Sequence, residues 1–363
     1  MSKRKIESKS GFETKVMEFC EEFGGMKNYH IHGDRAYTRD DLYYRKTGKA
    51  IYELERLTLP EKQKLTWALH EGIAFHPDCI EKRMTKLLTE SEKFGVTEVY
   101  TTTDITYNTK LISFNVAKRL AEKWKGRVDL KIGAYNPSGF KKGEADKERF
   151  ELFEEAAKDA DFLVGLAEKD RAPGHIGERQ HNFYMLNLSY RLGKPVQFHV
   201  GQENRSGDNT VETLLQDIEI VQDVHLRVGP EKFPQIYLVH AISPFCKSEK
   251  EIDGMIGKTA ERGIKLICCP RAAISMLQDR SERAPTHNSI ADIWRFAAKG
   301  IRVHLGVDNL EDIYVPASSA DLYEEAEYVA NSLRYYKERL IAKVLCGSEF
   351  DDFDQGTLKL HLS

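Results

Sequence analysis

Eight short apolar segments, rich in β-branched residues, alternate with long amphipathic segments along the 363-residue sequence. Turn-forming residues bound the apolar segments, whereas the segments between them carry the helical repeat. Several helical segments end in the glycine that commonly stops a helix, just before the next apolar run. Strand–helix alternation repeated eight times predicts an α/β fold, the (β/α)8 TIM barrel. The predicted strands are 26–32, 97–106, 128–135, 161–167, 195–202, 235–242, 263–269 and 301–308, and clear helical patterns occupy 113–124, 148–160, 210–224 and 289–300.

The chain exceeds the length of a bare barrel, which is roughly 250 residues, by about 110 residues. Part of the excess is 34–75, a charged and tyrosine-rich insertion after strand 1 with a short helical stretch at 61–72. An insertion at the C-terminal end of a barrel strand lies over the active-site face, so 34–75 is predicted to be a lid; a plain surface loop is the alternative. The rest is 317–346, predicted to form one or two closing helices. We expect a single domain over 1–363.

Composition excludes several classes of protein. Apolar residues make up 41% and charged residues 31%, and the formal net charge is −3, so no basic surplus points to nucleic acid. No apolar run approaches the roughly 20 residues that span a bilayer. The six cysteines lack CxxC spacing and are expected to be reduced, which favours a cytoplasmic protein.

Histidines and one aspartate fall at the ends of the predicted strands. His30 and His32 end strand 1, two residues apart and therefore on one face. His199, His240 and Asp308 end strands 5, 6 and 8. Barrel active sites are built at this face from several strands, and imidazole with carboxylate is a common ligand set for zinc and iron. The pattern predicts a site for a divalent metal ion.

The motifs around these residues resemble the amidohydrolase superfamily, in particular its mononuclear branch around cytosine deaminase and adenosine deaminase. The resemblance runs from His30 to about residue 335. The run CCPRAAISMLQDR and the following APTHNSIADIWRFAAKGIRVHLGVDN look most like the cytosine-deaminase arrangement. The other motifs are HIHGD (30–34), FHVGQEN (198–204), LVHAIS (238–243) and LGVDN (305–309).

This resemblance implies the ligands and the chemistry. His30, His32, His199 and Asp308 would hold one Zn²⁺ or Fe²⁺ ion. His240 would polarise the substrate or the catalytic water, and Asp308 would carry a proton from that water to the leaving nitrogen. The implied activity is hydrolysis of a C–N bond in a small molecule.

Three departures qualify the resemblance. Gln202 stands where the deaminases have a glutamate that protonates a substrate ring, and a neutral amide cannot deliver a proton; Glu203, one residue on, is the alternative acid. The 29 residues before His30 and 55 after Asp308 leave no room for the β-sandwich of cytosine deaminase. Strand 4 contains no lysine for a carbamylated bridge, which favours one metal ion over two.

Further residues are candidates for substrate binding. Asp104 ends strand 2 and would face the pocket, or else cap a helix or pair with a cation; Asn136 follows strand 3. Arg271 follows strand 7 and could clamp a carboxylate or carbonyl-rich ring, or else be a solvated charge. His287 precedes a predicted helix, and it could face the pocket if Thr286 or Asn288 caps that helix. His70, like three other histidines away from the strand ends, is expected at the surface.

The predicted function is metal-dependent deamination of a small heterocyclic amine. Hydrolysis of a cyclic or linear amide is the second hypothesis, favoured by Gln202, and a metal-binding barrel without catalysis is the third. Aromatic residues in 322–340 could form an interface between copies of the chain.

Overall fold

The computed structural model describes residues 10–143, 146–228, 232–277 and 290–362. Eight parallel strands form one sheet in the order β1 to β8, and a bridge between Ile31 and Asp308 joins its two edges. The predicted (β/α)8 barrel is confirmed. The strands are β1 (Met26–Ile31), β2 (Val96–Asp104), β3 (Asp129–Tyr135), β4 (Phe162–Gly165), β5 (Val196–Val200), β6 (Ile236–His240), β7 (Lys265–Cys268) and β8 (Val303–Leu305).

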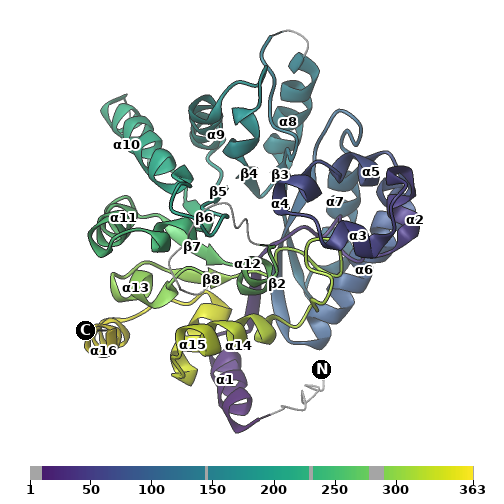
Figure 1. Cartoon of the computed structure of the whole chain (residues 1–363). Helices are drawn as coiled ribbons and strands as arrows, with labels where there is room; N and C mark the ends of the chain where they lie inside the picture. Colours follow the sequence, from purple (N-terminus) through teal and green to yellow (C-terminus); the bar gives the residue numbers. More distant parts are fainter. Residues whose placement is uncertain (1–9, 144–145, 229–231, 278–289, 363) are drawn as a thin grey trace.

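Helices surround the strands in Figure 1, which looks along the barrel. The segments predicted to be helical at 113–124, 148–160 and 210–224 are helices, and 289–300 contains the short helix α13 (Ile293–Ala298). The helices between strands are α6 (Pro77–Lys93), α7 (Ile112–Trp124), α8 (Lys147–Asp159), α9 (Glu178–Leu192), α10 (Thr210–Val228), α11 (Glu249–Glu261) and α13 (Ile293–Ala298). Single turns η4 (Ala167–Arg171), η5 (Ser243–Cys246) and α12 (Pro270–Ile274) follow β4, β6 and β7.

Both faces of the strands are buried, which accounts for their Val-, Ile- and Leu-rich sequences. The predicted C-terminal helices are α14 (Leu322–Leu333) and α15 (Glu338–Cys346), and α15 packs against α1 (Gly11–Glu22), β1 and β8. The sequence analysis did not predict α1 or α16 (Asp352–Leu362). In α16 only Asp354 and Leu358 are buried, so this helix lacks a continuous apolar stripe.

The insertion after strand 1, here called the β1–α6 segment (residues 32–76), consists of short helical turns. Its α4 and α5 divide the helical stretch expected at 61–72. Its hydrogen bonds to the barrel include Gln63 to Glu168 (3.3 Å), Thr66 to Tyr314 (3.5 Å) and His70 to Asp104 (2.7 Å). The turns are α2 (Asp41–Tyr44), η1 (Arg45–Thr47), α3 (Ile51–Glu55), α4 (Leu59–Gln63), α5 (Thr66–His70) and η2 (Ile73–Phe75).

Within the described residues, no helix combines the length and the apolar character needed to cross a membrane.

The closure of the barrel depends on a close approach at Gly306. A Cβ at this position would lie 2.8 Å from the carbonyl oxygen of His30 and 2.9 Å from its Cβ. Because these atoms belong to β1, the strand would have to move away from the end of β8. We expect Gly306→Ala to lower the free energy of unfolding by about 1–3 kcal/mol in urea denaturation.

Gly254→Ala is the matched control, because a Cβ at Gly254 in α11 meets nothing within 4 Å. The higher helix propensity of alanine should raise the free energy of unfolding there by about 0.5–1 kcal/mol. A Gly306→Ala protein as stable as the Gly254→Ala protein would contradict the prediction.

Candidate metal centre

The structure brings together the four residues predicted as metal ligands. His30 lies in β1 and His32 directly follows it, His199 lies in β5, and Asp308 follows β8. One potential ligand atom from each residue lies within 4.8 Å of the others, and all four residues are buried. The closing backbone bonds run from Asp308 N to the His30 carbonyl (2.9 Å) and from His32 N to the Asp308 carbonyl (2.8 Å). Barrel closure therefore sets the spacing of three of the four residues.

Each of the three histidines has a partner at its Nδ1 atom. His30 Nδ1 lies 2.7 Å from Gln197 Oε1, whose orientation is fixed because Gln197 Nε2 donates to the Tyr29 carbonyl. His32 Nδ1 lies 2.8 Å from the Thr102 hydroxyl, and His199 Nδ1 lies 3.3 Å from the Gly165 carbonyl oxygen. A partner at Nδ1 fixes the ring orientation and leaves Nε2 free to bind a metal.

The Nε2 atoms of His30 and His199 face each other at 3.0 Å. An amide oxygen and a carbonyl oxygen can only accept, so both Nδ1 atoms must donate their protons to them. In neutral rings both Nε2 atoms then carry lone pairs, and neither can donate to the other. Two lone pairs at this distance repel each other, and a metal ion bound to both nitrogens would relieve that repulsion. The donor set therefore fits a metal ion on the evidence of its own hydrogen bonds.

The surroundings keep these side chains in the forms that bind metals. Burial lowers the pKa of His32 to about 4, although the hydrogen bond to Asp308 opposes the shift. Burial also lowers the pKa of His199 well below its ordinary value. Burial alone would raise the pKa of Asp308, but the neighbouring His30, His32 and His240 outweigh burial and hold this pKa well below its usual range. Neutral imidazoles and an ionised carboxylate are the ligand forms required.

Asp308 and His240 are placed so that each carboxylate oxygen has a different neighbour. Asp308 Oδ1 lies 3.3 Å from His32 Nε2, whereas Oδ2 lies 3.7 Å from His240 Nε2. Both residues have left-handed backbone angles, with φ of 62° at Asp308 and 77° at His240. Such strained non-glycine positions are concentrated at functional sites. Burial lowers the pKa of His240 to about 4.

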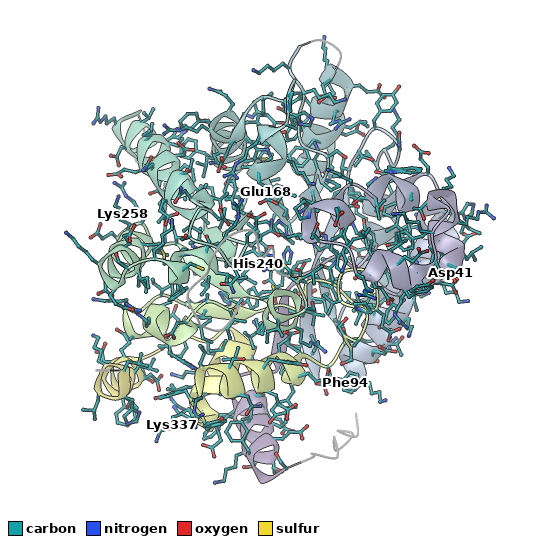
Figure 2. All side chains as sticks on the ribbon, viewed as in Figure 1. Asp41, Phe94, Glu168, His240, Lys258 and Lys337 are labelled. Atoms are coloured by element: carbon teal, nitrogen blue, oxygen red, sulfur yellow. The ribbon has the colours of Figure 1, made fainter. Side chains whose placement is uncertain are left out.

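These residues line a cavity of about 680 Å³, a volume that includes its open mouth. In Figure 2, His240 lies near the barrel axis, and the labelled Glu168 belongs to η4. The β1–α6 segment supplies Leu57, Leu59, Lys62 and Gln63 to the wall, and its predicted role as a lid stays a prediction. At the candidate metal centre the cavity is lined by His32, His199, His240 and Asp308. The other residues that line it are Arg35, Tyr135, Leu166, Gln202, Ala272, Ala273, Met276, Leu277, Asn309, Tyr314 and Val315.

Gln202 lies at the cavity wall, and its amide group is held by Glu168. Gln202 Nε2 donates to Glu168 Oε1 at 2.9 Å, and Gln63 Nε2 donates to the same oxygen at 3.3 Å. Burial raises the pKa of Glu168. Glu203, the alternative acid, instead pairs with Arg205 and does not line the cavity.

Asp104, expected in the substrate pocket, is buried beneath the cavity in an ion pair. Its carboxylate accepts from Arg35 Nε and Nη2, both at 2.7 Å, and lies 2.7 Å from His70 Nε2. Of the roles expected for Asp104, the structure therefore shows the pairing with a cation. His70 is buried at this carboxylate rather than at the surface, because α5 turns it toward the barrel.

Two other expected substrate ligands also lie outside the cavity wall. Arg271 is buried, and its guanidinium is held by Glu324 and Glu325 of α14 and by the Ser319 carbonyl. Asn136 donates to the Gly139 carbonyl at 2.8 Å and holds the turn after β3. These side chains therefore stabilise loops in this arrangement. His287 lies outside the described residues.

Sequence reasoning missed several residues of this site. Gln197 lies two positions before His199 on β5, so strand alternation could have placed it on the same inward face. Arg35 and Lys62 belong to the β1–α6 segment, where no pattern separates Lys62 from the exposed Lys64. Their positions depend on how the short helices of this segment fold.

Comparisons with known proteins agree with the architecture. No protein-family model matches the sequence, and no curated protein matches it. Among solved structures, 5-methylcytosine deaminase from Klebsiella pneumoniae has a TM-score of 0.72 at 18% identity, over 93% of this chain and 75% of that one. N-isopropylammelide isopropylaminohydrolase from Burkholderia multivorans has a TM-score of 0.63 at 17% identity, over 88% and 72%. A zinc-bound amidohydrolase from Burkholderia ambifaria has a TM-score of 0.55 at 13% identity, over 99% and 93%. The chain thus shares the barrel fold of these deaminases and amidohydrolases.

The role of Gln197 can be tested separately from the ligands themselves. Gln197→Leu removes the acceptor of the His30 Nδ1 proton, so we expect the affinity for zinc to fall by about 10- to 100-fold in competition with a chromogenic chelator. Gln197→Glu keeps an acceptor oxygen and should retain most of the affinity. Wild-type affinity in the leucine variant would show that this hydrogen bond does not orient His30.

Proposed function

We propose that the chain is a mononuclear metal-dependent hydrolase of the amidohydrolase superfamily, which deaminates a small heterocyclic amine. The observation that carries the proposal is the opposition of the unprotonated Nε2 atoms of His30 and His199 at 3.0 Å, beside His32 and Asp308 at a cavity wall. The fold shared with deaminases supports it.

His30, His32, His199 and Asp308 would hold one divalent ion, zinc or ferrous iron. Three imidazoles and a carboxylate suit both metals. The strand β4, Phe162–Gly165, contains no lysine, which favours one ion over a bridged pair. A bound divalent metal lowers the pKa of water from 15.7 toward 7 and so supplies a hydroxide nucleophile at neutral pH.

The residues of the chain then account for the proton transfers. Asp308 Oδ1 is directed toward the ligand histidines, so Oδ2 is free to accept the proton of the attacking water and pass it to the leaving nitrogen. His240, neutral and 3.7 Å from Oδ2, would orient the water or polarise the bond under attack. Burial of these groups strengthens both interactions.

Gln202 distinguishes deamination from the second candidate function, amide hydrolysis. Its Nε2 donates to Glu168, so its Oε1 is the group available to a substrate, as an acceptor. An acceptor would bind a substrate N–H and would not protonate a ring nitrogen. Cyclic and linear amides, which need no ring protonation, therefore remain the alternative substrates. Ammonia release without a new carboxylate identifies deamination, and a new carboxylate without ammonia release identifies cyclic-amide opening.

Two broader expectations are part of the proposal. A reducing, cytoplasmic location is supported by the six free cysteines. Formation of a homo-oligomer is supported by the exposed side chains of Tyr328 and Tyr336 in the region 322–340.

Asp308→Asn tests the mechanism. Loss of the proton acceptor should reduce turnover of any substrate by at least about 100-fold, while the fold is retained in circular dichroism. Asp352→Asn, at an exposed carboxylate of α16, is the matched control and should keep wild-type activity. An Asp308→Asn protein that turns over at the wild-type rate would exclude this mechanism. A chain that binds metal but hydrolyses nothing in broad amine and amide panels would instead favour the catalytically silent barrel.

A further inference from the structure

Lys62 is a buried cation in the wall of the cavity that contains the metal centre. It belongs to α4 of the β1–α6 segment and is only 4% exposed. The same cavity is lined by His32, His199 and Asp308. The segment above the barrel therefore brings a positive charge into the space that a substrate would occupy.

The ammonium group of Lys62 has no hydrogen-bond or ion-pair partner among the residues that the structure describes. The carboxylates with the strongest influence on it are Asp312 and Glu55, and both are engaged elsewhere. Asp312 accepts from Asn309 Nδ2 at 2.7 Å and from two backbone N–H groups, and Glu55 accepts from Arg39 Nε at 2.6 Å. Burial accordingly lowers the pKa of Lys62. A buried cation without a partner is unfavourable, unless a bound ligand supplies a negative charge or hydrogen-bond acceptors.

Arg35 contributes a second cationic side chain to the same wall. Its Nε and Nη2 atoms bind Asp104, which balances its charge and fixes the plane of the guanidinium. Its Nη1 group makes no hydrogen bond within the described part of the chain. Arg35 can therefore still donate to a ligand, while Lys62 keeps one uncompensated positive charge.

The remaining walls suit the faces of a flat molecule. Tyr135 and Tyr314 line the cavity together with Leu57, Leu166 and Met276. Aromatic and aliphatic side chains bury the faces of a ring, and N–H donors at Lys62 and Arg35 would bind acceptors at its edge. The wall thus combines apolar surface with the positive charges of Lys62 and Arg35.

We propose that the substrate of this site is an anionic heterocycle, whose carboxylate or ring-borne negative charge is bound by Lys62 Nζ with assistance from Arg35. This inference rests on the proposed function, since it names the class of amine or amide that the metal centre would attack.

The test measures binding to zinc-loaded protein by isothermal titration calorimetry, with three matched pyrimidines at neutral pH. Uracil is neutral, barbiturate carries its negative charge in the ring, and orotate carries an exocyclic carboxylate. We expect at least one anion to bind the wild type more tightly than uracil does, and the stronger of the two identifies which kind of anion the site prefers.

Lys62→Met should weaken binding of the preferred anion by about 10- to 100-fold and leave that of uracil unchanged. It should also unfold at a temperature no lower than the wild type, because an unpaired buried charge has been removed. Lys62→Arg should retain the preference. Lys64→Met removes an exposed lysine two residues away, and it should bind all three compounds as the wild type does.

The inference is overturned if uracil binds the wild type as tightly as both anions, if neither anion binds, or if Lys62→Met retains the preference. These outcomes are independent of turnover. Suppose that an anion binds, that this binding requires Lys62, and that the protein hydrolyses no compound. Only the proposed function would then be rejected. Hydrolysis of neutral amines by a protein that binds neither anion more tightly than uracil would reject only this inference.

Discussion

The hydrogen bonds that join the end of β1 to the residues after β8 are the constraint on which the rest of the structure depends. They close the barrel through the backbone of His30, His32 and Asp308, three of the four residues of the candidate metal centre. Folding and site assembly are consequently one event: the sheet cannot close in this register without placing these ligands together. The close approach of Gly306 to His30 and the left-handed conformation of Asp308 are local features of the same junction.

Around this junction, buried polar groups are held in defined orientations. Gln197, Thr102 and the Gly165 carbonyl each engage one imidazole at Nδ1, so the Nε2 atoms point to a common centre. Without a cation, the opposed lone pairs and the ionised Asp308 would be costly in an interior from which water is excluded. This polar centre is physically reasonable as a binding site for a positive ion, and it gives the proposed hydrolysis its nucleophile. The β1–α6 segment adds a different property, because Lys62 and Arg35 add positive charge to the cavity wall.

Much of the fold and of the ligand set could be predicted from the sequence. The positions of all eight strands follow from apolar runs between turn residues, because strands buried on both faces must be apolar. The convergence of His30, His32, His199, His240 and Asp308 could be predicted because the C-terminal ends of parallel barrel strands meet at one face. The choice of four of them as metal ligands came from the resemblance to the amidohydrolase superfamily. Helices such as α16 were not predicted, since only Asp354 and Leu358 are buried in it and its pattern is correspondingly weak.

The sequence by itself determined the barrel and the convergence of the four residues of the candidate metal centre, since both depend on local periodicity and on residues at strand ends. Only the tertiary structure decided the partners of charged side chains in loops. Asp104 and Arg271 had the chemistry of substrate ligands, yet Arg35 and the glutamates of α14 bind them. Lys62, in contrast, is buried in the cavity while Lys64 is exposed. The physical reason is that the partner of a charge is set by the path of segments far away in the chain, which no local pattern encodes.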